Sequence, residues 1–512
     1  MTTFTKNDAL RWLSFSLIAL AVLVCYYPSL YYPPRADQVI YLSETSGLHK
    51  PWDLIFGCYN HNRHRTIAPG DELLFRPLLY AFLGVEQVLF GHHFWAWQLT
   101  ALGAHLVLIW VLLRLLWHVS GPWLAFAGAW SFALAVSNYE LVTWPHLSSY
   151  LLMMACVIAS VEQMVLCFEE GDVPQRRIIR LLVYFFIACF IYETANIFAL
   201  MITAALGLGF PARRRRAAVL LIPVVLYVFF SLFDYFYVDH VVHAAAGPVK
   251  PLAPVKYLIQ VIHLTLWWFY QGLFSGLYHY KLAVRTMFLK DEVMVFKPLV
   301  GSLEVILSLI SLGAFSGLAW FSRAGLSKRA WSCLVLSGML LAYTAVIVAG
   351  RWHEKADLAT SIGVNSYFSY IFWAIAVMLA FMFLSDGQMK AGRGKMLVVL
   401  FVIAGLVSGS GNGKRVYGMA LDYSRSTRSI VLLVTTLDLL IQEKGKEPGF
   451  SFYVDPQYPG NYPYPGIQKI GAPSGKVYSF AEFLYPQYFR PRALAMYRFL
   501  TTKEKPRQKT GL

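Results

Sequence analysis

The chain has 512 residues, of which 57% are hydrophobic and 14% charged, and its mean hydropathy is +0.52. A soluble protein of this length would carry far more charge, so the composition excludes an ordinary soluble enzyme. The formal net charge of +16 would suggest a nucleic-acid partner in a soluble protein, but no DNA- or RNA-binding motif is present. We therefore predict no nucleic-acid partner, and attribute the charge to cytoplasmic loops and to attraction for anionic lipid headgroups.

Long apolar runs recur from the first residues onward, each near the roughly 20 residues that a transmembrane helix needs. They predict an all-α polytopic membrane protein with about 11 spans, counting one long run as two helices. The candidate spans are 11–30, 93–117, 122–138, 147–168, 181–210, 217–237, 299–321, 331–349, 367–385 and 396–411. The runs 73–90 and 256–278 are ambiguous, and we expect both on the outer side of the membrane.

Basic loops orient these spans, because cytoplasmic loops are enriched in Lys and Arg. The densest cluster is Arg213–Arg216, and it faces the cytoplasm only if the run 181–210 turns back on itself. We expect the turn at Glu193, and we expect the run 73–90 to lie along the outer interface as a helix that does not cross. The prediction is an N-terminus inside and a C-terminus outside.

The composition changes after residue 411. The stretch DPQYPGNYPYPG is rich in Pro, Tyr and Gly, and a basic tail ends the sequence. We predict two domains: a transmembrane domain over 1–411 and a small extracytoplasmic α/β appendage over 412–512, with one helical run and one strand-like run.

The first outer loop contains the first group of candidate site residues. Asp37 follows a Pro-Pro-Arg segment at the outer end of the first span, where a carboxylate could act as a general base. His61, Arg63 and His64 lie in the segment HNRHR, and Arg76 precedes the run 77–90. Arginine suits phosphate because its planar fork donates two parallel hydrogen bonds.

A second group of candidates lies in later outer turns. Glu140, Trp144 and His146 occupy the short segment SNYELVTWPH between two spans. Glu193 interrupts a nearly uncharged run of 30 residues, where a carboxylate is costly and usually faces a cavity or a partner. Arg351 lies in a late outer segment, AGRWHEK.

Several of these motifs together resemble the GT-C superfamily of membrane glycosyltransferases, and most closely the bacterial relatives of the protein O-mannosyltransferases. The motifs are ADQVIYL, then FRPLLYAFLGVEQVLFG, a span with an internal His105, SNYELVTWPHLSS, IYETANIFAL and GRWHEK…NSYFSYIFW. The likeness covers roughly residues 10–210, with a weaker echo at 345–385. Relatives usually have Lys-Glu in the fifth motif, where this chain has Tyr192 and Glu193.

This resemblance implies a catalytic role for Asp37, as the base that deprotonates the acceptor, together with Glu140 and Glu193, which would shape the acceptor side or orient groups around it. It implies that cations stabilise the departing donor phosphate, and these are Arg76, Arg351, His61, His64 and Arg63. His146, Trp144 and Tyr367 would shape the acceptor side.

The implied partners are a polyprenyl-phosphate-linked sugar donor, a glycan, lipid or protein acceptor, and membrane lipids. No cofactor or metal site is predicted. A divalent metal is only a secondary option, because the spacing of HNRHR matches no established metal site. The implied location is the cytoplasmic (inner) membrane of a bacterium, with chemistry on the periplasmic side.

Other classes of protein fit parts of this pattern. A polysaccharide polymerase or ligase also has many spans and outer arginines, but it usually concentrates them in a large central loop. A transporter or flippase of lipid-linked sugars would favour internal repeats and charges at the membrane midplane, which this sequence lacks. A non-catalytic scaffold is a further alternative.

Overall fold

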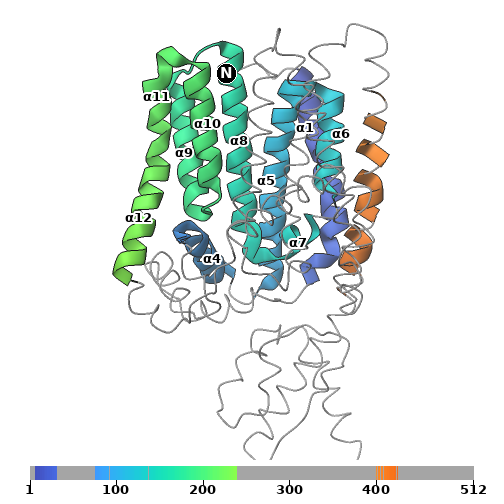
Figure 1. Ribbon diagram of the computed structural model, residues 1–512. Helices are drawn as coiled ribbons and strands as arrows, with labels where there is room; N and C mark the ends of the chain where they lie inside the picture. Colours follow the sequence, from blue (N-terminus) through green and yellow to red (C-terminus); the bar gives the residue numbers. More distant parts are fainter. Residues whose placement is uncertain are drawn as a thin grey trace, which may run out of the picture.

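The computed structural model describes residues 6–31, 75–90, 93–135 and 138–238, and part of one further helix between 399 and 424. The secondary structure in these ranges is helical throughout, without strands (Figure 1). Four of the described helical segments are long and apolar enough to cross a membrane: Asn7–Leu30, Trp95–His118, Pro145–Glu170 and Pro211–Phe233. The prediction of a helical membrane protein is thus confirmed at this coarse level.

The helices form a bundle in which successive long segments run in opposite directions (Figure 1). Its members are α1 (Lys6–Tyr26), α5 (Phe94–Ser120), α6 (Pro122–Ala133), α8 (Ser148–Glu170), α9 (Gln175–Ile191), α10 (Ala195–Gly209), α11 (Arg214–Ala218) and α12 (Ile222–Val238). Helices α11 and α12 continue along one axis. Helix α5 packs against α6 and α8, and α8 packs against α9, so α5 and α8 lie at the centre of the described part. Apolar side chains such as Ile109, Met154 and Leu181 fill the space between them.

The two ends of the bundle differ in what they contain (Figure 1). At the end that we call the α4 end lie α4 (Pro77–Phe90), α7 (Asn138–Thr143) and the turn at residues 192–194. At the opposite end, which we call the N-terminal end, α1 begins, and the connections between α5 and α6, α8 and α9, and α10 and α11 are found. Helix α4 has 14 residues, or about 21 Å, which is short for a membrane span.

The predicted reversal at Glu193 is confirmed, because α9 ends at Ile191 and α10 begins at Ala195. Tyr192 ends α9 by adopting an extended backbone with φ −146° and ψ 131°. Asn196 stabilises the turn by donating from Nδ2 to the backbone oxygen of Glu193 at 2.8 Å. The arrangement brings residue 193 to the α4 end.

The predicted span 122–138 is shorter in the structure. Helix α6 has 12 residues and ends at Ala133, so it extends about 18 Å. Asn138 explains the early end, since its Nδ2 donates to the backbone oxygen of Phe132 at 2.6 Å and turns the chain into α7. The apolar residues after Ala133 therefore belong to a connection that leads to α7.

The described part of the late helix between 399 and 424 packs closely on α6. A Cβ atom added to Gly409 would collide with the Trp130 ring, and one added to Gly405 would lie 3.2 Å from the backbone oxygen of Ala127. Glycine allows this close approach without a shift of the facing residues, and small residues at such contacts are typical of helix pairs in membranes.

Helical positions in this segment continue past residue 411, where the sequence suggested a domain boundary, to residue 424. The predicted spans between 299 and 385 and most of the predicted appendage, 412–512, lie outside the described residues. The division into two domains therefore stays a prediction.

Candidate functional site

The structure describes the backbone of five predicted site residues, and all five lie at the α4 end: Arg76, Glu140, Trp144, His146 and Glu193. Glu140 lies within α7. The other predicted site residues lie outside the described residues, and they are Asp37, His61, Arg63, His64, Arg351 and Tyr367.

Arg76 and Glu193 form a bidentate ion pair across 117 positions of sequence. Arg76 donates from Nε to Glu193 Oε2 at 2.8 Å and from Nη2 to Glu193 Oε1 at 2.7 Å. This is the two-bond geometry in which arginine binds carboxylates and phosphates most strongly. The pair fastens the start of α4 to the turn between α9 and α10.

An aromatic ring covers the same guanidinium. The Cζ atom of Arg76 lies 3.9 Å from the ring centroid of Tyr192, a cation–π contact. The Tyr192 ring packs edge-on against Tyr150 of α8, at a centroid distance of 5.1 Å. Burial disfavours the charged guanidinium, but Glu193 and Tyr192 outweigh this effect and hold the pKa of Arg76 well above its ordinary value.

The pair determines what Arg76 can do chemically. Two edges of the guanidinium, Nε and Nη2, are bound to Glu193, and the pair does not use Nη1. An incoming phosphate would therefore have to bind at Nη1 or compete with the Glu193 carboxylate for the fork. Arg76 is therefore a cation held in a fixed orientation, and its Nε–Nη2 edge is already bound to Glu193.

Glu86 is a further carboxyl at this end that the sequence interpretation missed. Glu86 lies on α4 and is only 2% exposed. Ser148 at the start of α8 donates from Oγ to Glu86 Oε1 at 3.2 Å. Burial raises the pKa of Glu86 well above its ordinary value, and the Ser148 hydrogen bond opposes this only in part. A signal was present, since Glu86 is the sole charge in the apolar run PLLYAFLGVEQVLF.

Trp144 and His146 lie just before Ser148 in the chain, the residue that donates to the Glu86 carboxyl. Their rings stack with centroids 5.6 Å apart and an interplanar angle of 29°. His146 belongs to the 3-10 turn η4 (Pro145–Leu147), which leads directly to Ser148. The predicted acceptor-side residues are thus close in sequence to the serine that binds Glu86.

Buried polar atoms without a hydrogen-bond partner among the described residues gather at the α4 end. They include Glu86 Oε2, Gln98 Oε1, Asn138 Oδ1, Ser149 Oγ and Thr194 Oγ1. Such atoms are rare in native proteins, because each costs free energy that folding alone does not recover. Their concentration supports this end as a place where polar groups interact with something beyond the described helices.

The N-terminal end is richer in satisfied pairs, although Nε of Arg11 near the start of α1 also lacks a hydrogen-bond partner among the described residues. Arg114 donates from Nη2 to both carboxylate oxygens of Glu162, each at 2.9 Å. Arg177 donates from Nε to Glu170 Oε2 at 2.9 Å and from Nη1 to Gln163 Oε1 at 3.0 Å. These groups join α5, α8 and α9 through satisfied pairs.

Within the described ranges, no three His, Cys, Asp or Glu side chains gather in a way that could hold a metal ion. The HNRHR segment lies outside these ranges. The absence of a cofactor therefore stays a prediction.

Comparisons with models of known protein families, with curated proteins and with solved structures find no match for this chain. The likeness to the GT-C superfamily consequently rests on the sequence motifs alone. What the site can do has to be argued from its own residues.

Proposed function

We propose that the protein is a membrane glycosyltransferase that moves a sugar from a polyprenyl-phosphate carrier to an acceptor. The observation that carries this proposal is the Arg76–Glu193 pair, since it joins two motifs that the family pattern assigns to one site. The buried polar atoms at the same end give further support. A bundle of apolar helices is a suitable setting for a lipid-linked donor.

The proposed reaction is a displacement at the anomeric carbon. Asp37 takes the proton of the acceptor hydroxyl, the hydroxyl oxygen attacks the anomeric carbon, and the bond from that carbon to the phosphate oxygen breaks. The lipid phosphate leaves with the bonding electron pair. Fixed cations near this growing charge lower the barrier, and we assign that role to Arg76 and Arg351, assisted by Arg63, His61 and His64.

Arg76 acts in this scheme together with its partner. Glu193 and Tyr192 orient the guanidinium, and the donor phosphate approaches Nη1, the edge that the pair with Glu193 does not use. Glu140 and Glu193 shape the acceptor side, with Trp144, His146 and Tyr367. The orientation of Arg76 before the donor arrives is a form of preorganisation, which avoids a rearrangement during the reaction.

The proposal includes a topology. The chain has about 11 spans, with its N-terminus in the cytoplasm and its C-terminus, including the α/β appendage of 412–512, outside. The membrane is the inner membrane of a bacterium, and the α4 end faces the periplasm. The arginines at the N-terminal end then face the cytoplasm, in keeping with the charge rule.

The substitution Asp37→Asn tests the reaction. Transfer from a lipid-linked sugar in vesicles should fall about 10²–10⁴-fold, the usual cost of losing a general base. Asp172→Asn is the matched control, since Asp172 lies in the turn between α8 and α9 at the N-terminal end, and it should keep normal transfer. Near-normal transfer by a folded, inserted Asp37→Asn protein would remove Asp37 from the mechanism.

A further inference from the structure

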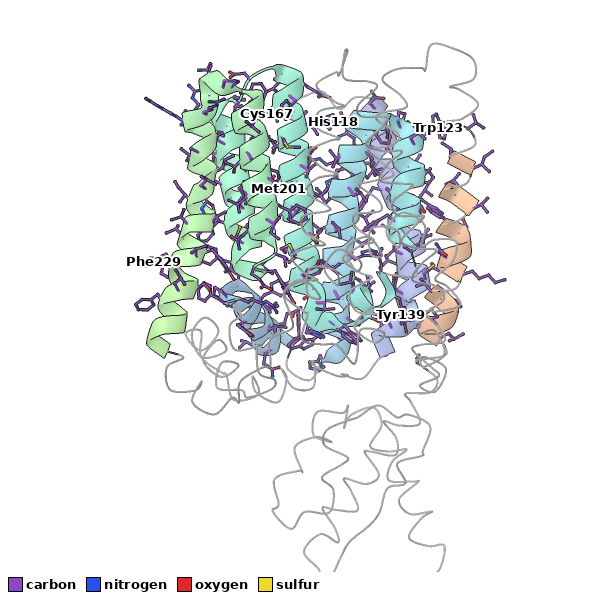
Figure 2. All side chains as sticks on the ribbon, in the orientation of Figure 1. His118, Trp123, Tyr139, Cys167, Met201 and Phe229 are labelled. Atoms are coloured by element: carbon purple, nitrogen blue, oxygen red, sulfur yellow. The ribbon has the colours of Figure 1, made fainter. Side chains whose placement is uncertain are left out.

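Exposed arginines gather at one corner of the N-terminal end, where α9 meets α11. Arg176 and Arg180 are exposed on the first turns of α9, and Arg214–Arg216 are exposed on α11. The two helices contact each other, so the arginines belong to one surface. Figure 2 shows nitrogen-tipped side chains extending outward from this part of the bundle.

Some cations of this corner are already occupied within the protein. Arg176 donates to Glu170 at 3.3 Å, and Arg213 donates from Nε to Asp172 at 3.0 Å. Arg214 donates from Nε to the backbone oxygen of Gly207 at 3.2 Å. Three exposed arginines form no ion pair with the described residues, and we call them the arginine corner: Arg180, Arg215 and Arg216.

Exposed apolar residues continue from the arginine corner along the helices. On α9 they are Ile179, Val183 and Phe186, which recur at the spacing of one helix face. On α12 the exposed residues Ile222, Val225 and Phe229 recur in the same way, and α9 packs against α12. Phe229, labelled in Figure 2, points away from the bundle. Each stripe is suited to contact with lipid chains.

We propose that the arginine corner binds the phosphate of an anionic phospholipid, with the acyl chains of that lipid against the two apolar stripes. The surface matches both parts of such a lipid, since guanidinium groups bind the phosphate of the headgroup and the apolar helix faces contact the acyl chains. Long arginine side chains can extend toward the headgroup region while their stems remain in apolar surroundings. This site lies at the opposite end from the proposed transfer site and does not depend on that function.

The test uses the purified full-length protein in mild detergent, to which phosphatidylglycerol or phosphatidylcholine of the same chain length is added. Native mass spectrometry counts retained lipids, and thermal unfolding measures protection. Phosphatidylglycerol should be retained and should protect, whereas phosphatidylcholine should do so much less. Equal retention and equal protection by the two lipids would overturn the proposal.

The variant that carries Arg180→Gln, Arg215→Gln and Arg216→Gln should weaken phosphatidylglycerol binding roughly 100-fold, at about fivefold per surface cation. The matched control removes three positive charges from the tail, by Lys503→Gln, Lys505→Gln and Arg507→Gln, and should bind as the unmodified protein does. Unchanged binding by the corner variant, or an equal loss in the tail variant, would contradict the assignment.

A second variant tests the proposal if the triple glutamine variant does not insert into the membrane. Lysine at all three corner positions keeps the charge but loses the fork, so this variant should insert normally and bind phosphatidylglycerol more weakly than arginine does. Inorganic phosphate at matched concentration should neither protect nor displace the lipid. Full binding by the lysine variant, or displacement by free phosphate, would show that no lipid-phosphate site of this kind exists.

Discussion

The two ends of the bundle treat their buried polar groups differently. At the N-terminal end, Glu162 is nearly inaccessible, with a side chain 2% exposed, and both of its oxygens accept hydrogen bonds from Arg114. At the α4 end, Glu86 is equally buried, yet its Oε2 has no partner among the described residues. A satisfied pair supports the fold, whereas an unsatisfied carboxyl weakens it.

This difference indicates how the two ends are used. The N-terminal end holds α5, α8 and α9 together through its ion pairs. Among the described residues, the α4 end has the bidentate Arg76–Glu193 pair together with several buried polar atoms that lack a hydrogen-bond partner. Costly polar groups are commonly retained at functional sites, which is consistent with the proposed site at the α4 end and with structural support at the other end.

The largest effect on stability is expected from Arg114→Met. The change removes the arginine that binds both oxygens of the buried Glu162 carboxylate and leaves it only His118, whose Nε2 lies 3.7 Å from Glu162 Oε1. Because Arg114 is itself 37% exposed, the loss should be about 3 kcal/mol of folding free energy, at the low end of the range for breaking a buried pair. Unfolding of the full chain in detergent, followed by circular dichroism, measures the loss. Adding Glu162→Met should restore most of the stability, since the charge is then gone as well. If Arg114→Met alone were as stable as the unmodified protein, the Arg114–Glu162 pair would not support the fold, and the comparison between the two ends would fail.

A smaller effect is expected from Glu86→Gln, and it should depend on pH. Because the folded-state pKa of Glu86 is raised, the folded protein holds this proton more tightly than the unfolded chain does. The contribution of this proton to the free energy of unfolding is complete below the ordinary glutamate pKa of about 4.3. It is lost as the pH rises through the raised pKa of the folded state.

Glutamine cannot ionise, so the Glu86→Gln variant should lack this loss and should exceed the unmodified protein in melting temperature at neutral pH. Melting temperatures from about pH 4 to pH 8 measure the effect. Ser148→Ala keeps the carboxyl and is the control, in which the fall with pH should persist. Parallel curves for Glu86→Gln and the unmodified protein would show that Glu86 does not titrate as its burial requires.

The smallest effect is expected from Arg213→Gln at the N-terminal end. Arg213 and Asp172 form a pair at 3.0 Å, but their side chains are 42% and 47% exposed, so water and salt screen the attraction. The loss of folding free energy should be far smaller than for Arg114→Met and should shrink further in high salt. If Arg213→Gln destabilised the protein as much as Arg114→Met, solvent exposure would not explain the difference in strength between these two ion pairs.

Parts of the fold could be predicted from the sequence because they follow from local rules. Apolar length predicts the helices, and the charge rule requires a turn at Glu193, which the structure has. The early end of α6 could not be predicted in this way. The residues after Ala133 remain apolar, and only the hydrogen bond from Asn138 to Phe132 shows that the helix has ended.

The site was less predictable than the fold. Arg76 and Glu193 could each be recognised as unusual, but their pairing depends on how α4 packs against the turn that follows α9. Glu86 stands out as the sole charge of α4, but the sequence does not show whether that charge faces solvent or the bundle. Its burial follows from contact with Ser148 at the start of α8, which no local pattern encodes.

The most direct test of the division between the two ends compares Arg76→Lys with Arg177→Lys. Both arginines form hydrogen-bonded pairs with a glutamate, one at each end, and lysine keeps the charge but loses the fork. Turnover of a lipid-linked sugar donor and melting temperature are measured on the same preparations. We predict that Arg76→Lys lowers turnover about 10²-fold or more, as loss of a transition-state donor does, with a small change in melting temperature. Arg177→Lys should lower the melting temperature and leave the turnover of the folded protein unchanged. Full turnover by Arg76→Lys together with loss of turnover in Arg177→Lys would contradict the account.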